Sequence, residues 1–178
     1  SGRPVPLTNS IYNGTDTGII FNVLESVQLQ SVDVFSTGAG TINIQIVNSA
    51  GVQLYETGTV NVTAGGITTP NVIPLDYTIA PGTGYRMLIK AYSTTVNLVR
   101  ESGIDGFPYN GTDGLLNVTN GYITGTVGTT YYYFYNSEYV GKCVSPRKEV
   151  VATISPAPVL TLSTNEVSIC EGDTSLVT

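Results

Sequence analysis

The fold is decided by one short stretch, Thr41-Ile42-Asn43-Ile44-Gln45-Ile46-Val47, in which polar and apolar side chains alternate strictly. Side chains that alternate with a period of two lie on opposite faces of a β-strand, so this stretch predicts a strand with one face in a core. The stretch from Val27 to Phe35 repeats the pattern with one slip. Neither stretch has the 3.6-residue period of a helix, and we expect an all-β protein.

Segments of the same kind cover most of the chain and are separated by turns rich in Gly, Pro, Asn and Ser. The expected strands cover residues 18–24, 27–35, 41–47, 52–57, 58–62, 71–79, 85–92, 95–100, 115–119, 122–127, 130–139 and 148–154. Many short strands at spacings near ten residues predict a sandwich of two sheets or a barrel. The long irregular loop from Glu101 to Gly114 favours a jelly-roll-like antiparallel two-sheet sandwich over an up-and-down barrel.

Composition excludes several classes of function. The 178 residues include 7 Lys and Arg against 13 Asp and Glu, which gives a net charge of −6. Such a chain is a poor ligand for nucleic acids or anionic membranes, so we expect no nucleic-acid partner. The chain has no His and no Trp, which removes histidine-dependent triads and His-ligated metals. No apolar run is long enough for a membrane span, and we expect no membrane insertion.

A change in composition near the C-terminus predicts a domain boundary. Ser155-Pro156-Ala157-Pro158 favours extended polyproline geometry and is interpreted as a short, stiff linker. The predicted organisation is a jelly-roll-like module at 1–154, a linker at 155–158, and the beginning of a second domain at 159–178.

Two cysteine-containing stretches carry a resemblance to a known family. They are Gly141-Lys142-Cys143-Val144-Ser145-Pro146-Arg147 and Ile169-Cys170-Glu171-Gly172. These stretches resemble the closing and opening motifs of the immunoglobulin-like repeats in long secreted or surface adhesin-type proteins of gliding, Bacteroidetes-type bacteria. Four further runs resemble β-sandwich modules found between such repeats: Val34 to Ile42, Val60 to Gly65, Ile79 to Arg86, and Tyr131 to Tyr135.

The resemblance implies a setting and a pairing of the cysteines. In the family, the opening and closing motifs lie in one repeat and are expected to form a disulfide. Here the closing motif comes first, which implies that Cys143 and Cys170 belong to successive units and are not bonded to each other. Residues 159–178 would then be the first strands of an immunoglobulin-like domain, and the chain would be part of a longer extracellular array, secreted or attached to the cell surface.

The aromatic run Tyr131-Tyr132-Tyr133-Phe134-Tyr135 is the first candidate site. In a regular strand, Tyr131, Tyr133 and Tyr135 share one face, and the other two rings share the opposite face. One face must join the core, and the other could form a platform on which sugar rings stack. The alternative is that both faces are packing residues. Side chains of the neighbouring loop would complete the site; these are Arg100, Tyr109 and Asn110.

The second candidate is a repeated pentapeptide, Tyr12-Asn13-Gly14-Thr15-Asp16 and Tyr109-Asn110-Gly111-Thr112-Asp113. Two unrelated Asn-Gly turns would explain the identity. Oxygen ligands for Ca²⁺ could come from Asp105, Asn110 and Asp113, or from Asn13 and Asp16. Calcium is the one cofactor that these residues suggest, and none is required for the fold.

No pattern of catalytic residues is complete. Glu101 with Asp105 or Asp113 could supply the two carboxylates of a glycosidase, but solvated loop charges are the preferred interpretation. We therefore expect no enzymatic activity. The predicted function is a non-catalytic adhesion or recognition module that binds glycans, another surface, or neighbouring modules and protein subunits. The alternative is a purely structural stalk or filament spacer.

Overall fold

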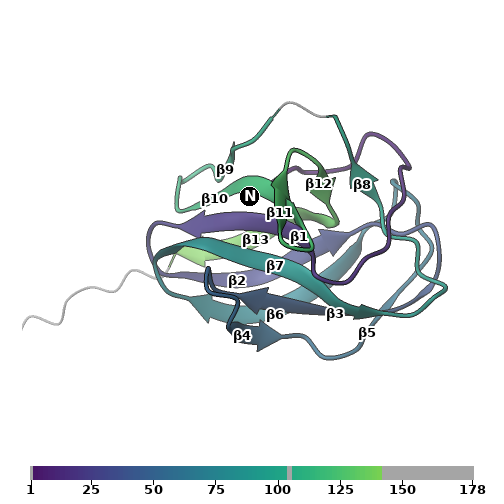
Figure 1. Cartoon of the computed structure of the whole chain (residues 1–178), viewed down its shortest axis with the longest axis horizontal. Coiled ribbons are helices and arrows are strands. Elements are labelled where there is room, and N and C mark those ends of the chain that lie inside the picture. Colours follow the sequence, from purple (N-terminus) through teal and green to yellow (C-terminus); the bar gives the residue numbers. More distant parts are fainter. Residues whose placement is uncertain (1, 104–105, 142–178) are drawn as a thin grey trace, which may run out of the picture. The chain divides into compact units, whose positions relative to one another are not determined.

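The structure is a computed structural model that describes residues 2–103 and 106–141 (Figure 1). These residues lie in one compact unit, Ser1–Val144. The predicted linker, the second domain, Cys143 and Cys170 lie outside the described residues. Among the described residues there is no helix that could cross a membrane.

The strands of the described residues form two sheets of three or more strands and one small ribbon. The larger sheet has eight strands in the order β11-β10-β1-β7-β3-β4, with β5 paired to β3 and β9 paired to β10. Its strands are β1 (Thr17–Val23), β3 (Gly40–Val47), β4 (Gln53–Glu56), β5 (Val60–Val62), β7 (Gly82–Tyr92), β9 (Tyr109–Asn110), β10 (Leu116–Ile123) and β11 (Thr126–Gly128). The smaller sheet has the order β13-β2-β6, with β2 (Val27–Val34), β6 (Asn71–Ile79) and β13 (Phe134–Gly141). A ribbon pairs β8 (Arg100–Glu101) with β12 (Tyr131–Tyr132).

The chain crosses repeatedly between the two sheets, which are packed against each other (Figure 1). Strands β1, β3, β7 and β10 lie in the larger sheet, whereas β2, β6 and β13 lie in the smaller one. The pairings within both sheets are antiparallel. The predicted all-β antiparallel sandwich is confirmed, and the crossings between sheets distinguish it from an up-and-down barrel.

The core lies between the sheets and follows the alternation of the sequence. On β3, Ile42, Ile44 and Ile46 are fully buried, whereas Asn43 and Gln45 between them are half-buried. The same cluster contains the inward residues of β1, β2 and β6. Burial of these apolar side chains is the main favourable term in folding.

Several boundaries differ from the sequence-based expectation. The expected strands at 115–119 and 122–127 are not separated at 120–121, because β10 continues through Asn120 and Gly121 to Ile123. Gly121 is instead a point of close approach, since a Cβ atom there would lie 1.7 Å from the carbonyl oxygen of Thr130. The chain turns later, at Thr124 and Gly125, which have φ angles of 42° and 86°. The predicted strand at 95–100 is reduced to isolated bridges followed by β8.

Candidate functional site

All five rings of the aromatic run are buried, and the predicted stacking platform is therefore wrong. Tyr131, Tyr133 and Tyr135 are each 0% exposed, and Tyr132 and Phe134 are 4% and 0% exposed. A platform for a sugar ring needs an exposed ring face. These side chains belong to the hydrophobic core.

The expectation of two faces failed because the run is not one strand. Tyr133 has φ of 60°, a left-handed conformation that is strained for a bulky residue. Before it, β12 pairs with β8; after it, β13 pairs with β2 in another sheet. The alternation of side chains is lost at this change of sheet, so rings from both sides of Tyr133 enter the core.

Tyr131 is the polar centre of this aromatic cluster. Its hydroxyl donates to the carbonyl oxygen of Phe134 at 2.8 Å and accepts from the backbone N–H of Arg3 at 3.1 Å. Its ring contacts Tyr109, with ring centroids 5.3 Å apart, and Tyr135, with centroids 5.2 Å apart. Burial raises the pKa of Tyr131 far above the ordinary value of 10. Tyr109, a predicted binding residue, is thus a half-buried packing residue whose hydroxyl accepts a bond from Arg3.

Arg100 and Glu101 also have structural partners. The guanidinium of Arg100 lies 5.2 Å from the ring centroid of Tyr12, a cation–π geometry. Glu101 is only 2% exposed, forms an ion pair with Arg3, and accepts a hydrogen bond from the N–H of Leu7 at 2.5 Å. The interpretation of Glu101 as a solvated loop charge is therefore wrong. It holds the N-terminal segment against the sandwich.

The two copies of the pentapeptide occupy different environments. In the first copy, Asn13 donates from Nδ2 to the carbonyl oxygen of Val96 at 2.6 Å and accepts from the N–H of Leu98 at 2.9 Å. The nitrogen and the oxygen of this amide both form hydrogen bonds with the backbone of a neighbouring segment. In the second copy, Asn110 and Asp113 are exposed. The identical sequences do not form a repeated site.

The predicted calcium ligands are only partly placed. Asp105 lies outside the described residues. The Asp113 carboxylate accepts hydrogen bonds from the hydroxyl of Tyr139 and from the N–H of Leu115. Within 2–103 and 106–141, no group of three or more Asp, Glu, His or Cys side chains is arranged to hold a metal ion.

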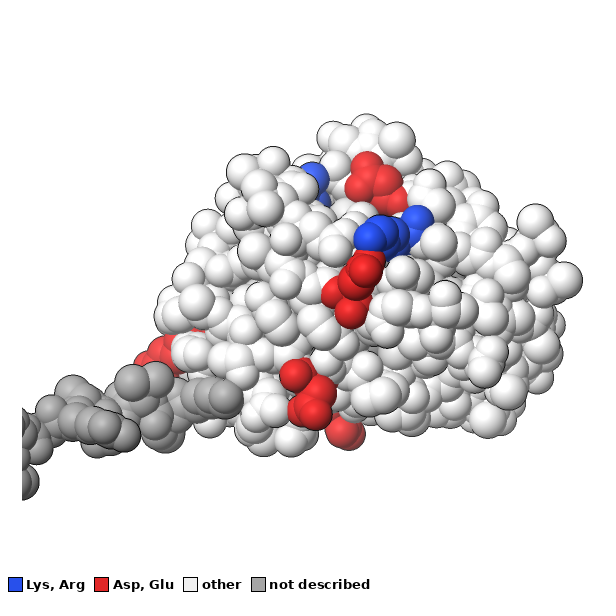
Figure 2. Space-filling model, turned by 90° about the horizontal axis from the view of Figure 1, so that it is seen from below, with Lys and Arg blue, Asp and Glu red and all other residues white. Residues whose placement is uncertain are grey.

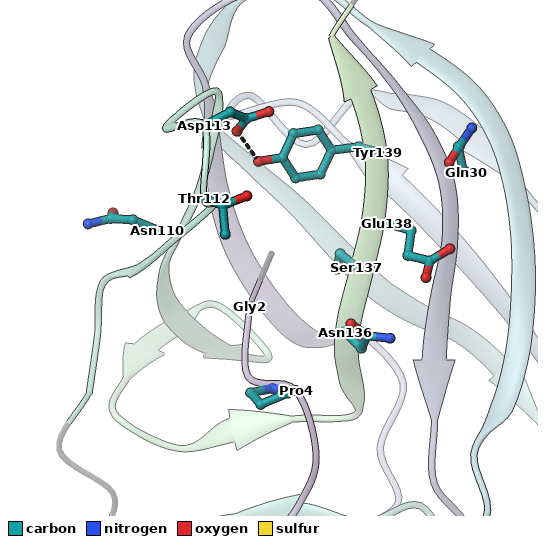
Figure 3. A pocket seen from close by; sticks show the side chains of 10 residues that line it. All are labelled: Gly2, Pro4, Gln30, Asn110, Thr112, Asp113, Asn136, Ser137, Glu138 and Tyr139. Atoms are coloured by element: carbon teal, nitrogen blue, oxygen red, sulfur yellow. Dashed lines mark hydrogen bonds between the residues drawn. The ribbon is translucent and has the colours of Figure 1, made fainter.

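Asn110 and Asp113 line a groove of about 490 Å³, which is the strongest candidate site (Figure 3). The groove runs along β13, where residues 136–139 form one wall. The end of β9 and the turn after it form the opposite wall with Asn110, Thr112 and Asp113. Gly2 and Pro4 of the N-terminal segment close one side, and Gln30 of β2 completes the lining. Its volume is within the usual range for small-ligand sites.

A hydrogen bond joins the two walls of the groove. Figure 3 shows the side chains of Asp113 and Tyr139 pointing toward each other, and the Tyr139 hydroxyl donates to Asp113 Oδ1. This bond holds the pKa of the exposed Asp113 carboxyl below its usual value. Burial, together with the hydrogen bond to Asp113 and its charge, raises the pKa of Tyr139. Asp113 therefore remains ionised and Tyr139 remains a neutral donor near neutral pH.

A second carboxylate group lies on the β13 wall. Glu138 lines the groove and accepts a hydrogen bond from the Ser31 hydroxyl at 3.3 Å. Asn136, also in the lining, donates from Nδ2 to Asp33 Oδ2 at 3.1 Å. Burial raises the pKa of Asp33; the bond from Asn136 opposes this shift and the charge of Glu138 adds to it.

The sequence-based reasoning missed Asn136, Glu138, Tyr139 and Asp33. The sequence held one sign of this region, which is the slip in the alternation of polar and apolar residues between Val27 and Phe35. In the structure, the register between β2 and β13 shifts at Tyr135 to Glu138, and the register between β2 and β6 shifts at Leu29 to Ser31. Such bulges commonly redirect side chains near sites.

Charged side chains are sparse on the face drawn in Figure 2, where they form small separate groups among uncharged residues. No protein-family model, curated protein or solved structure matches the chain.

Proposed function

We propose that the chain is a non-catalytic recognition module that binds a saccharide in the groove between β13 and the turn after β9. The resemblance of its motifs to extracellular repeat proteins supports a place in a secreted or surface-attached bacterial protein. The observation that carries the proposal is the composition of the groove lining. Residues with amide, hydroxyl and carboxylate groups line one concave surface and come from separate elements.

These groups match the chemistry of a sugar. Each sugar hydroxyl is both a donor and an acceptor of hydrogen bonds. The amides of Asn110 and Gln30 supply donors and acceptors, and the carboxylates of Asp113 and Glu138 supply acceptors. The Tyr139 ring adds the apolar contact area that a sugar ring needs in such a site. These side chains lie in one groove, whereas the five rings of the aromatic run are buried.

A glycan array on the full chain, followed by calorimetric titration, tests the proposal. We expect binding of at least one class of saccharide. The variants Asn110→Ala and Tyr139→Ala should each weaken that binding about tenfold, because each loses groups that contact the ligand. The control is Asn61→Ala, since Asn61 is an exposed amide on β5 that does not line the groove.

The outcomes separate the proposal from the structural alternative. Weakened binding in groove variants that remain folded, with unchanged binding in the control, supports recognition at this site. A folded protein that binds no neutral, acidic or amino-bearing polysaccharide would contradict the proposal and favour a structural spacer. Equal loss in all three variants would contradict the location of the site.

A further inference from the structure

The charges around the groove narrow the class of saccharide. Resting on the proposed function, we infer that the groove prefers a saccharide that carries a free amino group over its neutral N-acetylated counterpart, and that it rejects saccharides that carry carboxylates. The discriminating residues are Asp113 on the turn after β9 and Glu138 on β13.

The charged side chains that line the groove among the described residues are all acidic. Asp113 and Glu138 are both exposed carboxylates, and neither Lys nor Arg is among the described residues that line the groove. Asp113 comes from the turn after β9 and Glu138 from β13, and Figure 3 draws their side chains on different sides of the β13 ribbon, so a ligand along the groove meets negative charge at two places. A protonated amine offers three donors and a positive charge to such acceptors, and charge-assisted bonds of this type are stronger than neutral ones.

The charge of Arg3 does not compensate these carboxylates. Arg3 adjoins the groove residues Gly2 and Pro4, but its guanidinium is paired with Glu101 and donates to the Tyr109 hydroxyl at 3.2 Å. Its side chain is 14% exposed. The positive charge of Arg3 is therefore neutralised by Glu101 at a largely buried position.

A third carboxylate lies on β2, the strand that pairs with β13. Asp33 accepts the hydrogen bond from Asn136, which itself lines the groove. Burial is the main cause of the raised pKa of Asp33, and the charge of Glu138 adds to the rise because like charges repel each other. An amine bound beside Glu138 would relieve this repulsion, whereas a uronate would add to it.

Competitive titration with three matched oligosaccharides tests the inference. The probes are oligomers of glucosamine, N-acetylglucosamine and glucuronic acid. Their binding to the full chain is measured at about pH 6, where the amino groups of the glucosamine units are protonated if they titrate as an α-amino group does. We expect glucosamine oligomers to bind about fivefold more tightly than their acetylated counterparts in low salt. The preference should fall when salt is added, because exposed charges are screened. Glucuronic acid oligomers should not bind measurably.

Charge-neutral variants assign the preference to the groove. Asp113→Asn and Glu138→Gln keep the shape and one acceptor oxygen of each side chain but remove its charge. Each should lower the affinity for glucosamine oligomers by a larger factor than the affinity for N-acetylglucosamine oligomers, so that the preference for the amine falls. The matched control is Asp76→Asn on β6, because Asp76 is an exposed carboxylate bonded to Gln28 that does not line the groove. It should leave the preference unchanged.

The failure of this inference can be told from the failure of the proposed function. Equal binding of the glucosamine and N-acetylglucosamine oligomers would overturn the amine preference but leave saccharide recognition standing. Binding of none of these probes or of any other glycan would remove both. Binding of a lysine-rich peptide in place of every saccharide would also overturn the inference, since it would assign the acidic groove to a protein partner.

Discussion

The side-chain amide of Asn136 donates a hydrogen bond to the carboxylate of Asp33, with Nδ2 and Oδ2 3.1 Å apart. The two residues lie on β13 and β2 where the register between these strands shifts, and Asn136 has φ of 43°. Asp33 is only 8% exposed. The bond connects a buried carboxylate to the groove, because Asn136 contributes to the groove lining.

The buried carboxylate predicts a specific dependence of stability on pH. Burial is the main reason that the pKa of Asp33 lies above 3.8 in the folded protein. The folded state therefore binds this proton more tightly than the unfolded state, and the contribution of Asp33 to stability falls as pH rises above 3.8 through the raised pKa. Asp33→Asn should have a higher melting temperature than the wild type at neutral pH, and the difference should vanish below pH 3.8 in thermal scans.

Asp113→Asn is a control, because its expected effect on stability at neutral pH is opposite to that of Asp33→Asn. The pKa of Asp113 is lowered by the hydrogen bond from Tyr139, so its contribution to stability is present at neutral pH and is lost as pH falls. Any stability change in this variant should be a decrease at neutral pH. A lower melting temperature of Asp33→Asn at neutral pH would contradict the role given to burial.

The tyrosine hydroxyls of the core predict an unequal response to Phe. Tyr131 has two hydrogen-bond partners, whereas the buried hydroxyls of Tyr133 and Tyr135 have none among the described residues. Tyr131→Phe should cost about 1–2 kcal/mol in the free energy of unfolding, because it breaks these bonds. Tyr133→Phe and Tyr135→Phe should change it by less than about 0.5 kcal/mol or increase it. Urea denaturation measures all three, and equal losses would refute the distinction.

The buried ion pair predicts that the N-terminal segment stabilises the sandwich. Glu101→Gln leaves an acceptor for the N–H of Leu7 but removes the charge that faces Arg3. An unpaired charge left at a buried site typically costs about 3 kcal/mol. The double variant with Arg3→Met should lose less stability than the sum of the two single variants in a double-mutant cycle. Strict additivity would show that the pair does not act as a unit.

The close approach of β10 and the segment before β12 predicts a strong effect of one methyl group. At Gly121 an added Cβ atom would lie 1.7 Å from the carbonyl oxygen of Thr130, whereas at Gly128 it would meet no atom within 4 Å. Gly121→Ala should cost about 3 kcal/mol or more, because a backbone atom must move. Gly128→Ala on β11 is the matched control and should change stability by less than about 0.5 kcal/mol. Similar melting temperatures for both variants would contradict the packing described for β10.

Much of the sandwich could be predicted from alternation alone. The strand at Asn71–Ile79 has the predicted bounds, and β3 differs from its prediction by one residue. Predictions from the local pattern were wrong at positions where tertiary contacts override that pattern. At Tyr133 the change of sheet depends on a left-handed backbone, and at Gly121 the strand continues because another backbone lies close by. Neither fact can be derived from the neighbouring residues.

The candidate site was harder to predict, because distant segments build it. Asn110 and Asp113 were singled out from one loop, but Glu138 and Tyr139 come from a strand that follows the aromatic run. The number of rings in that run suggested an exposed face. The structure buries them because several elements contribute one aromatic cluster, including Tyr109 and Phe35. Exposure depends on these long-range contacts and not on composition.

Chemical-shift mapping on the ¹⁵N-labelled full chain tests the central claim most directly. The protein would be titrated with oligomers of glucose, N-acetylglucosamine and glucosamine while its backbone amide signals are followed. Our account predicts saturable shifts at residues 110–113 and 136–139, with no shifts at the turn of residues 48–51. Saturable shifts confined to another surface, or no shifts with any of the three probes, would contradict the assignment of this groove as a saccharide-binding site.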